Sequence, residues 1–174
     1  MSPAAHSLPT LTAEPGDLVL RPSDPADAAP LLDLLREPAI TPWWGDNDLA
    51  SVTEEIIGAF TIVVDGEVAG ILECHEETEP MYPEVAFDIM LGTRWHGHGF
   101  GRRALRLAID HFISRDHHRF TIDPAVDNVA AVRCYAAVGF RPVGILRQAE
   151  RVPGGAPDEF RDAILMDLLA SDLS

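Results

Sequence analysis

The sequence predicts one α/β domain, with a largely antiparallel N-terminal half and a C-terminal half in which helices and strands alternate. First, 174 residues with 47% hydrophobic content provide one substantial core and are too few for two ordinary domains. Second, two β-rich runs are joined by Asp65-Gly66, a pair that tolerates the positive φ angles of a tight hairpin turn. Third, segments of helical periodicity alternate with short apolar runs after residue 100, as in an αβαβ unit.

The first 16 residues differ in composition from the rest of the chain. They are rich in Pro, Ser, Ala and Thr and have no periodicity, so residues 1–16 are expected to form a disordered leader. Order is expected to begin near Leu18. The sequence therefore predicts a leader over residues 1–16 and a single domain over residues 17–174.

Turn residues, caps and periodicity divide this domain into elements. Pro25 is typical of the first position of a helix, with Ser23 or Asp24 as the N-cap, and Gly139 ends a later helix. The expected elements are a strand over 18–22, a helix over 23–37, a loop over 38–48, a short helix over 49–57, strands over 60–64, 67–75 and 83–91, a long helix over 101–116, a strand over 119–124, a helix over 128–138, and strands over 139–147 and 160–169.

Charge and composition limit the classes of partner. With 28 acidic and 13 basic residues the net charge is −15, which argues against nucleic acid. No apolar run is long enough to cross a bilayer and the N-terminus does not resemble a signal peptide, so we expect a cytoplasmic protein without membrane contact. The two cysteines, Cys74 and Cys134, are expected to be reduced thiols. The acidity would attract a polycation, although it is also explained by solubility alone.

A glycine-rich segment between a predicted strand and the long helix indicates an anion site. Gly97, Gly99 and Gly101 recur at every second position within residues 94–101, so backbone N–H groups can approach an anion at the positive end of the helix. A pyrophosphate fits this description, and a tight turn without any ligand would use the same glycines. The Lys-Ser/Thr pair of a Walker loop is absent.

Two motifs in register resemble the core of the GNAT acetyltransferases. The segment R-x-x-G-x-G is followed by N-x-x-A-x-x-x-Y-x-x-x-G-F, and the match spans residues 83–140. This pattern is formed by Arg94, Gly97, Gly99, Asn128, Ala131, Tyr135, Gly139 and Phe140. The resemblance implies a mixed, mostly antiparallel sheet of about six to seven strands, splayed at its centre and flanked by about four helices. It also implies acetyl-CoA as co-substrate. No metal is expected, because neither His96 with His98 nor His117 with His118 has a third ligand at a recognisable spacing.

The resemblance further implies roles for individual positions. Backbone groups of Ile89 and Leu91 would pair with the pantetheine amides of the cofactor. Asn128 would contact the cofactor, and Tyr135 would act as general acid on the departing thiolate, although Tyr135 is also explained as a core aromatic. The pyrophosphate would be held by N–H groups from His96, Gly97, His98, Gly99, Phe100, Gly101 and Arg102. His96 replaces a frequent Arg or Lys, for which Arg102 and Arg103 could compensate.

A carboxylate is expected beside the acetyl group, because the acceptor amine must lose a proton before it attacks the thioester. Asp88 interrupts an apolar strand where this family splays its sheet. There it could be largely desolvated, with a raised pKa. The alternative is an aspartate that simply faces outward on an alternating strand.

The chain also resembles the aminoglycoside 6'-N-acetyltransferases within that family. Substrate-binding residues implied by this resemblance are Trp43, Trp44, Asp88 and Asp123, since carboxylates and aromatic faces attract a cationic small-molecule amine. The tryptophans could equally anchor a loop on the core, and Glu76, Glu77 and Glu79 could line a rim or a solvated loop. The alternative functions are acetylation of another small amine or siderophore precursor, and a non-catalytic acyl-CoA-binding module. The protein is expected to be a monomer or a homodimer.

Overall fold

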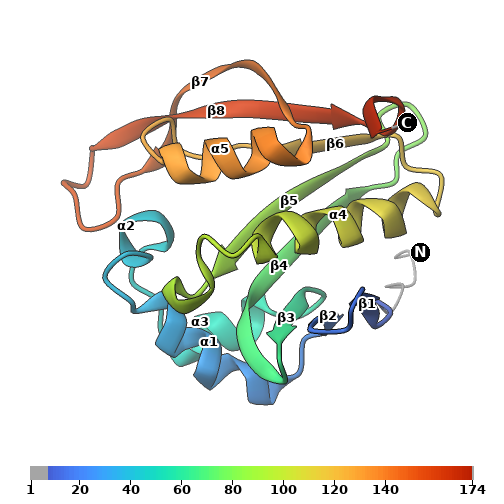
Figure 1. Ribbon diagram of the computed structural model, residues 1–174. Helices are drawn as coiled ribbons and strands as arrows, with labels where there is room; N and C mark the ends of the chain where they lie inside the picture. The colour runs from blue at the N-terminus through green and yellow to red at the C-terminus, as the bar shows by residue number, and fades with distance from the viewer. Residues whose placement is uncertain (1–7, 174) are drawn as a thin grey trace.

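The apolar runs of the sequence assemble into one mixed sheet, seen in a computed structural model that describes residues 8–173 (Figure 1). Within this range the sheet has eight strands in the order β1-β2-β3-β4-β5-β6-β8-β7. The strands are β1 (Leu11–Ala13), β2 (Leu18–Pro22), β3 (Phe60–Val64), β4 (Glu67–Glu77), β5 (Glu84–Leu91), β6 (Arg119–Ile122), β7 (Arg141–Arg151) and β8 (Phe160–Leu169). Neighbouring strands are antiparallel except for β5 and β6, which are parallel.

The two faces of the sheet carry different helices. The helices of the described residues are α1 (Ala28–Leu35), α2 (Thr41–Trp44), α3 (Leu49–Glu55), α4 (Phe100–Ile113) and α5 (Val129–Val138). Leu105, Ile109 and Phe112 of α4 lie in a core that also contains Tyr135 of α5. Side chains of α1 and α3 form a second core with Ile71 and Met90 of the sheet. Because side chains alternate along a strand, the two cores lie on opposite faces of β4 and β5.

The sheet is splayed at its centre. In the described residues, β5 pairs with β6 at two positions only, Val85 with Phe120 and Ala86 with Thr121. Beyond this point the two strands diverge, and the C-terminal part of β5, residues 87–91, keeps its ladder to β4 alone (Figure 1). The splay leaves one edge of β5 open in the middle of the molecule, as the family resemblance implied.

Most local predictions are confirmed. Asp65 and Gly66 adopt φ angles of 50° and 81° in the turn between β3 and β4. Asp24 is the N-cap of a short 3-10 turn (Pro25–Asp27) that leads into α1, with Pro25 at its start. Gly139 follows α5 with a φ of 126°. The mixed, mostly antiparallel sheet is also confirmed, with more strands and helices than the predicted numbers.

Two short elements were missed by the sequence interpretation. Leu11–Ala13 form β1, which pairs with β2, so the prediction that order begins near Leu18 is wrong for this segment; residues 1–7 of the expected leader lie outside the described residues. Leu11 and Ala13 pack against the core that holds α4, which favours the strand. The expected loop over residues 38–48 contains the four-residue helix α2. Both elements are too short to show a periodicity of their own.

Candidate active site

A cleft of about 680 Å³ passes through the splayed centre of the sheet. It is lined by Tyr135, which belongs to the core on the α4 side, and by Ile40 and Met90, which belong to the core on the opposite side. The gap between β5 and β6 therefore joins the two faces of the sheet. Of the predicted site residues, the cleft brings together Trp43, Trp44, Ile89, Leu91, His96, Gly97, Gly99, Gly101, Arg102, Asn128 and Tyr135.

The glycine-rich segment forms an open cradle at the start of α4. Gly97 and Gly99 have φ angles of 75° and 83°, in the left-handed region that favours glycine. A Cβ at Gly97 would meet open space, so the backbone is accessible there. Gly99 is the N-cap of α4 and has no side chain with which to cap the first turn. N–H groups at the positive end of a helix are thus available to an anion, and these residues fit the pyrophosphate of a coenzyme A thioester.

The open edge of β5 lies next to this cradle. Ile89 and Leu91 line the cleft, on the edge that β6 has left. An extended chain of amides can bind such an edge by adding to the ladder, which fits pantetheine. The ring of His96 turns back onto this strand, with its Nε2 atom 2.7 Å from the carbonyl oxygen of Leu91. This contact joins the glycine-rich segment to β5 and engages the Leu91 carbonyl oxygen, one of the backbone groups expected to pair with pantetheine.

Of the two arginines expected to compensate for His96, one fits the role. Arg102 lines the cleft beside the glycines. Arg103 instead points to the N-terminal segment, where its Nη1 atom donates to Asp17 at 2.9 Å and its Nη2 atom to the backbone oxygen of Glu14 at 2.9 Å. The expectation for Arg103 is therefore wrong, because a helix turns about 100° between neighbouring residues. Arg133, which sequence reasoning did not select, supplies a second cation to the lining.

Asn128 and Tyr135 are the two residues of the α5 motif for which a role toward the cofactor was predicted. Asn128 is the N-cap of this helix, and its Oδ1 atom accepts a hydrogen bond of 3.2 Å from the backbone N–H of Ala131. Tyr135 is 8% exposed and contacts the ring of Phe140, so it is a core aromatic and a cleft residue at once. Burial most of all, followed by Cys134 and the negative charges of Asp88 and Asp123, raises the pKa of the Tyr135 phenol. The phenol is therefore protonated and able to donate.

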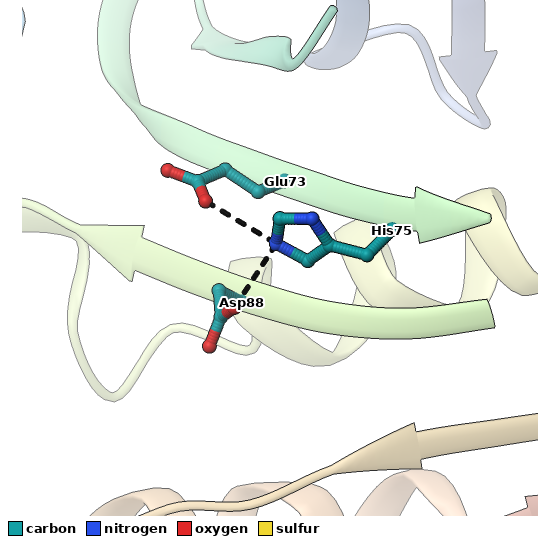
Figure 2. Close-up of side chains that lie close together, drawn as sticks. All are labelled: Glu73, His75 and Asp88. Carbon is teal, nitrogen blue, oxygen red and sulfur yellow. Dashed lines mark ion pairs between the residues drawn. The ribbon is translucent and has the colours of Figure 1, made fainter. Parts of the chain in front are cut away.

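Asp88 lies in a small cluster with Glu73 and His75 (Figure 2). Phe87 points into the core on the α4 side, so its neighbour Asp88 lies on the opposite face of β5. Its strand partner is Glu73 of β4, and His75 follows two residues later on the same face. The Nε2 atom of His75 lies 3.3 Å from Asp88 Oδ2 and 3.5 Å from Glu73 Oε2. The side chain of Asp88 is 51% exposed, so the expectation that it is largely desolvated is wrong. The helices α1 and α3 cover this face at Ile71 and Met90 and stop short of Asp88.

Glu73 has the environment that was expected for Asp88. Its side chain is 20% exposed, and burial followed by the charge of Asp88 raises the pKa of Glu73. Three ligand-type atoms of Glu73, His75 and Asp88 lie within 4.8 Å of one another, a spacing that a divalent cation could also use. Sequence reasoning missed Glu73 because a single glutamate in an apolar strand has no partner until β4 and β5 are in register.

Asp123 belongs to the same electrostatic group. It follows β6, where that strand has separated from β5. Partial burial, and then the charges of Asp88 and Glu150, raise the pKa of its carboxyl group. Asp88 thus raises the pKa values of both Glu73 and Asp123, and Glu73, Asp88, Asp123 and Glu150 form one acidic group around the splay. Glu76 is not part of this group, because it pairs with His117 and Arg115 at the far end of β4.

The tryptophan pair lies on α2, on the same face of the sheet as Glu73 and Asp88. Trp44 packs against the core formed by α1, α3 and the sheet, and both Trp43 and Trp44 line the cleft. Trp44 thus anchors α2 on this core and also lines the cleft, and substrate binding by Trp43 and Trp44 stays a prediction. Trp95 also lines the cleft, so all three tryptophans of the chain contribute to it. His98, Phe100, Asp88 and Asp123 do not belong to the cleft lining in the described part of the chain.

None of the helices within residues 8–173 is both long enough and apolar enough to span a bilayer.

Comparisons with known proteins agree with this geometry. Residues 17–141 match the family described as the acetyltransferase (GNAT) domain. RimJ of Mycobacterium smegmatis, solved with a CoA-disulfide, is 23% identical with a TM-score of 0.81 over 97% of this chain and 90% of RimJ. RimL, a ribosomal L7/L12 alpha-N-protein acetyltransferase in complex with coenzyme A, is 19% identical with a TM-score of 0.79 over 92% of this chain and 98% of RimL. The aminoglycoside acetyltransferase AAC(6')-Ib in complex with coenzyme A is 23% identical, with a TM-score of 0.73 over 90% of this chain and 96% of that enzyme.

No curated protein sequence matches the chain. The solved structures share the fold at low sequence identity, and the family match covers most of the residues that form the sheet, the glycine-rich cradle and the splay. The chain belongs to the acetyltransferase (GNAT) domain family, with acetyl-CoA as its co-substrate.

Proposed function

We propose that the protein transfers the acetyl group of acetyl-CoA to the 6'-amino group of an aminoglycoside, by direct attack in a ternary complex. The observation that carries this proposal is the acidic group Glu73, Asp88, Asp123 and Glu150 around the splay, in which burial and the charge of Asp88 raise the pKa values of Glu73 and Asp123. Aminoglycosides carry several ammonium groups, which carboxylates pair with and aromatic faces such as Trp43 attract. The structural likeness to an aminoglycoside acetyltransferase supports the same substrate class.

The reaction would proceed across the gap between β5 and β6. The acceptor ammonium gives one proton to the carboxylate of Asp88, with Glu73 as its strand partner, and the neutral nitrogen attacks the thioester carbon. An N–C bond forms and the C–S bond breaks. Tyr135 donates its phenol proton to the leaving sulfur, and the second proton of the amine restores the phenol. The products are the acetamide and free CoA, and no acyl-enzyme is formed.

A second candidate class is favoured by the comparisons. RimJ and RimL have higher TM-scores with this chain than AAC(6')-Ib has, and RimL acetylates the N-terminus of a ribosomal protein. A peptide α-amine carries one cationic group at the site of attack. It would make less use of the acidic group than a polycation does, so we favour the aminoglycoside.

The experiment is steady-state turnover with four kinds of acceptor at fixed acetyl-CoA. The panel contains kanamycin, simple primary amines, a hydroxylamine of the siderophore-precursor type, and a peptide with a free serine N-terminus. We expect kcat/KM for kanamycin to exceed that for the simple amines by about a hundredfold, because several ion pairs are formed at once. If kanamycin is not turned over above background while another member is, the aminoglycoside assignment is wrong. If no member is acetylated although acetyl-CoA binds, the non-catalytic alternative is favoured.

A further inference from the structure

A single arginine connects the acceptor end of the cleft to the C-terminal hairpin. Arg161 lies on β8, near the turn that joins β7 to β8, and its side chain is 13% exposed. Its Nη1 atom donates to the backbone oxygen of Pro42 in α2 at 2.8 Å. Its guanidinium carbon lies 4.9 Å from the centre of the Trp43 ring, within the range of a cation–π contact. In Figure 1 the turn of this hairpin lies above α2.

The helix that Arg161 contacts, α2, has few stabilising interactions of its own. All four residues of α2 retain some exposure to solvent, and four residues are too few for a helix to be stable by itself. Its start is tied to α1 by the hydroxyl of Thr41, which donates to the backbone oxygen of Leu35 at 3.1 Å. At its other end, a Cβ on Gly45 would lie 3.7 Å from Pro153 in the turn between β7 and β8. The position of the Trp43 ring thus depends on contacts from the β7–β8 hairpin, which are made by Arg161 and Pro153.

Glu150 completes the arrangement from the paired strand. Its Oε1 atom lies 2.6 Å from Nε of Arg161, across the β7–β8 ladder. The guanidinium group is therefore held by a carboxylate on one side and directed at α2 on the other. Because its charge is neutralised by Glu150, Arg161 can be placed beside a site for a cationic acceptor without repelling that acceptor.

We propose that Arg161 is a positioning residue that holds α2 and the Trp43 ring in place as the acceptor-side wall of the cleft. The wall is then formed by elements 119 positions apart in the sequence, as the contact with Pro42 shows. The proposal rests on the proposed function in that the acceptor enters on the face of α2. Its structural part, the order of the Trp43 wall, is measurable without any acceptor.

In the variant Arg161→Met, the change in charge and the loss of positioning are expected to have opposite effects on the KM of the acceptor. Removal of the cation leaves Glu150, a member of the acidic group, without its ion-pair partner, and the uncompensated negative charge would favour a cationic acceptor. Loss of the contacts to Pro42 and Trp43 releases the wall and disfavours binding. A rise in the acceptor KM in this variant therefore identifies positioning as the dominant effect.

The test compares Arg161→Met and Arg161→Lys with Arg151→Met in the full-length protein. Arg151 is the matched control, since it lies on the same hairpin and stacks on Phe160 at 4.7 Å, but it is exposed and has no hydrogen bond, ion pair or ring contact to α2 in the described residues. Arg161→Lys keeps the charge and loses the planar stack on Trp43. The two measurements are acrylamide quenching of tryptophan fluorescence and steady-state kinetics with kanamycin.

We expect quenching to increase in Arg161→Met and the kanamycin KM to rise by about tenfold, with the acetyl-CoA KM changed by less than about twofold. For Arg161→Lys, both the quenching and the kanamycin KM should lie between those of Arg161→Met and the unmodified protein. For Arg151→Met, both should equal those of the unmodified protein. Fluorescence is informative because the three tryptophans all line the cleft. Amide hydrogen exchange over residues 41–45 should accelerate in parallel.

The proposal is overturned if Arg161→Met is folded and leaves both quenching and exchange at residues 41–45 unchanged. A kanamycin KM that falls in this variant would also overturn it, because the charge effect would then dominate. If the parent protein does not turn over kanamycin, the proposed function fails, while quenching and exchange still decide whether Arg161 holds the wall. If Arg161→Met does not fold, the same criteria apply to Arg161→Lys.

Discussion

Asp27 is the residue on which the entrance to α1 depends. Its carboxylate accepts hydrogen bonds of 2.7 Å from both terminal nitrogens of Arg21 and one of 2.8 Å from the hydroxyl of Thr61. Burial by itself would raise the pKa of Asp27, but the hydrogen bonds from Arg21, from the backbone of Asp24 and from Thr61 outweigh it and lower the pKa to about 2. One side chain thereby joins β2, β3 and α1.

We expect Asp27→Asn to lower the free energy of unfolding by about 3 kcal/mol at neutral pH, because Arg21 loses its charged partner. The carboxyl pKa is lower in the folded protein than the value of about 3.9 in an unfolded chain. Its contribution is therefore complete above pH of about 4 and is lost as pH falls toward 2. Urea unfolding measured across this range checks both effects. The exposed Asp33→Asn is the control, and equal stability of the two variants would contradict the prediction.

Tyr135 allows a sharp test of the general acid. The phenol is buried and its pKa is raised, so it is protonated throughout the working pH range. Tyr135→Phe removes the proton donor and leaves the ring, so kcat should fall by about a hundredfold while the acetyl-CoA Kd changes by less than about twofold. Calorimetry gives the Kd and steady-state kinetics give kcat. The chain has one other tyrosine, Tyr82, which is 72% exposed, and Tyr82→Phe should behave as the parent.

At the scale of elements, the strand-to-helix turn before α4 predicts a difference between two similar glycines. Gly97 and Gly58 have φ angles of 75° and 85°, and a Cβ at either would meet open space. An alanine at either position should therefore cost about 1 kcal/mol in backbone strain. Only Gly97 lines the cleft, so Gly97→Ala should also weaken acetyl-CoA binding by about tenfold. Equal acetyl-CoA Kd values for the two variants, measured by calorimetry, would argue against the cradle.

The elements also show what the sequence could predict. The hairpin at Asp65-Gly66, the cap at Asp24 and the stop at Gly139 depend on local chemistry, and all three were predicted. In contrast, α2 and β1 are short and depend on distant partners, Arg161 for the first and β2 for the second. No local pattern encodes such contacts.

The same reasoning explains the mixed result at the candidate site. The glycines and the α5 motif are contiguous in sequence, and the cleft gathers most of them. The exposed Asp88 matches the alternative of an outward-facing aspartate, and the sequence could not decide for it, since both faces of β5 carry apolar residues and the alternation that distinguishes the faces is hidden. Glu73, His75 and Glu150 acquire their relation to Asp88 and Asp123 only through strand register.

For the whole molecule, the net charge of −15 predicts that the KM of a cationic acceptor depends on the salt concentration. Screening weakens the attraction of a multiply charged cation, so the kanamycin KM should rise by about tenfold between 0.05 and 0.5 M KCl. The value of kcat should change little, because screening acts mainly on the approach of the charged acceptor. Sucrose at equal osmolarity is the control. A kanamycin KM that is independent of KCl would show that the acidity serves solubility alone.

The two rungs that join β5 to β6 have a thermodynamic consequence. Because Val85–Phe120 and Ala86–Thr121 are the strand pairs that connect β1–β5 with β6–β8 in the described residues, backbone hydrogen bonding between these halves is sparse. A ligand that binds in the gap contacts both halves, and it binds the folded chain alone. Its free concentration is therefore linked to the folding equilibrium, so cofactor supply in the cell also sets how much of the protein remains folded.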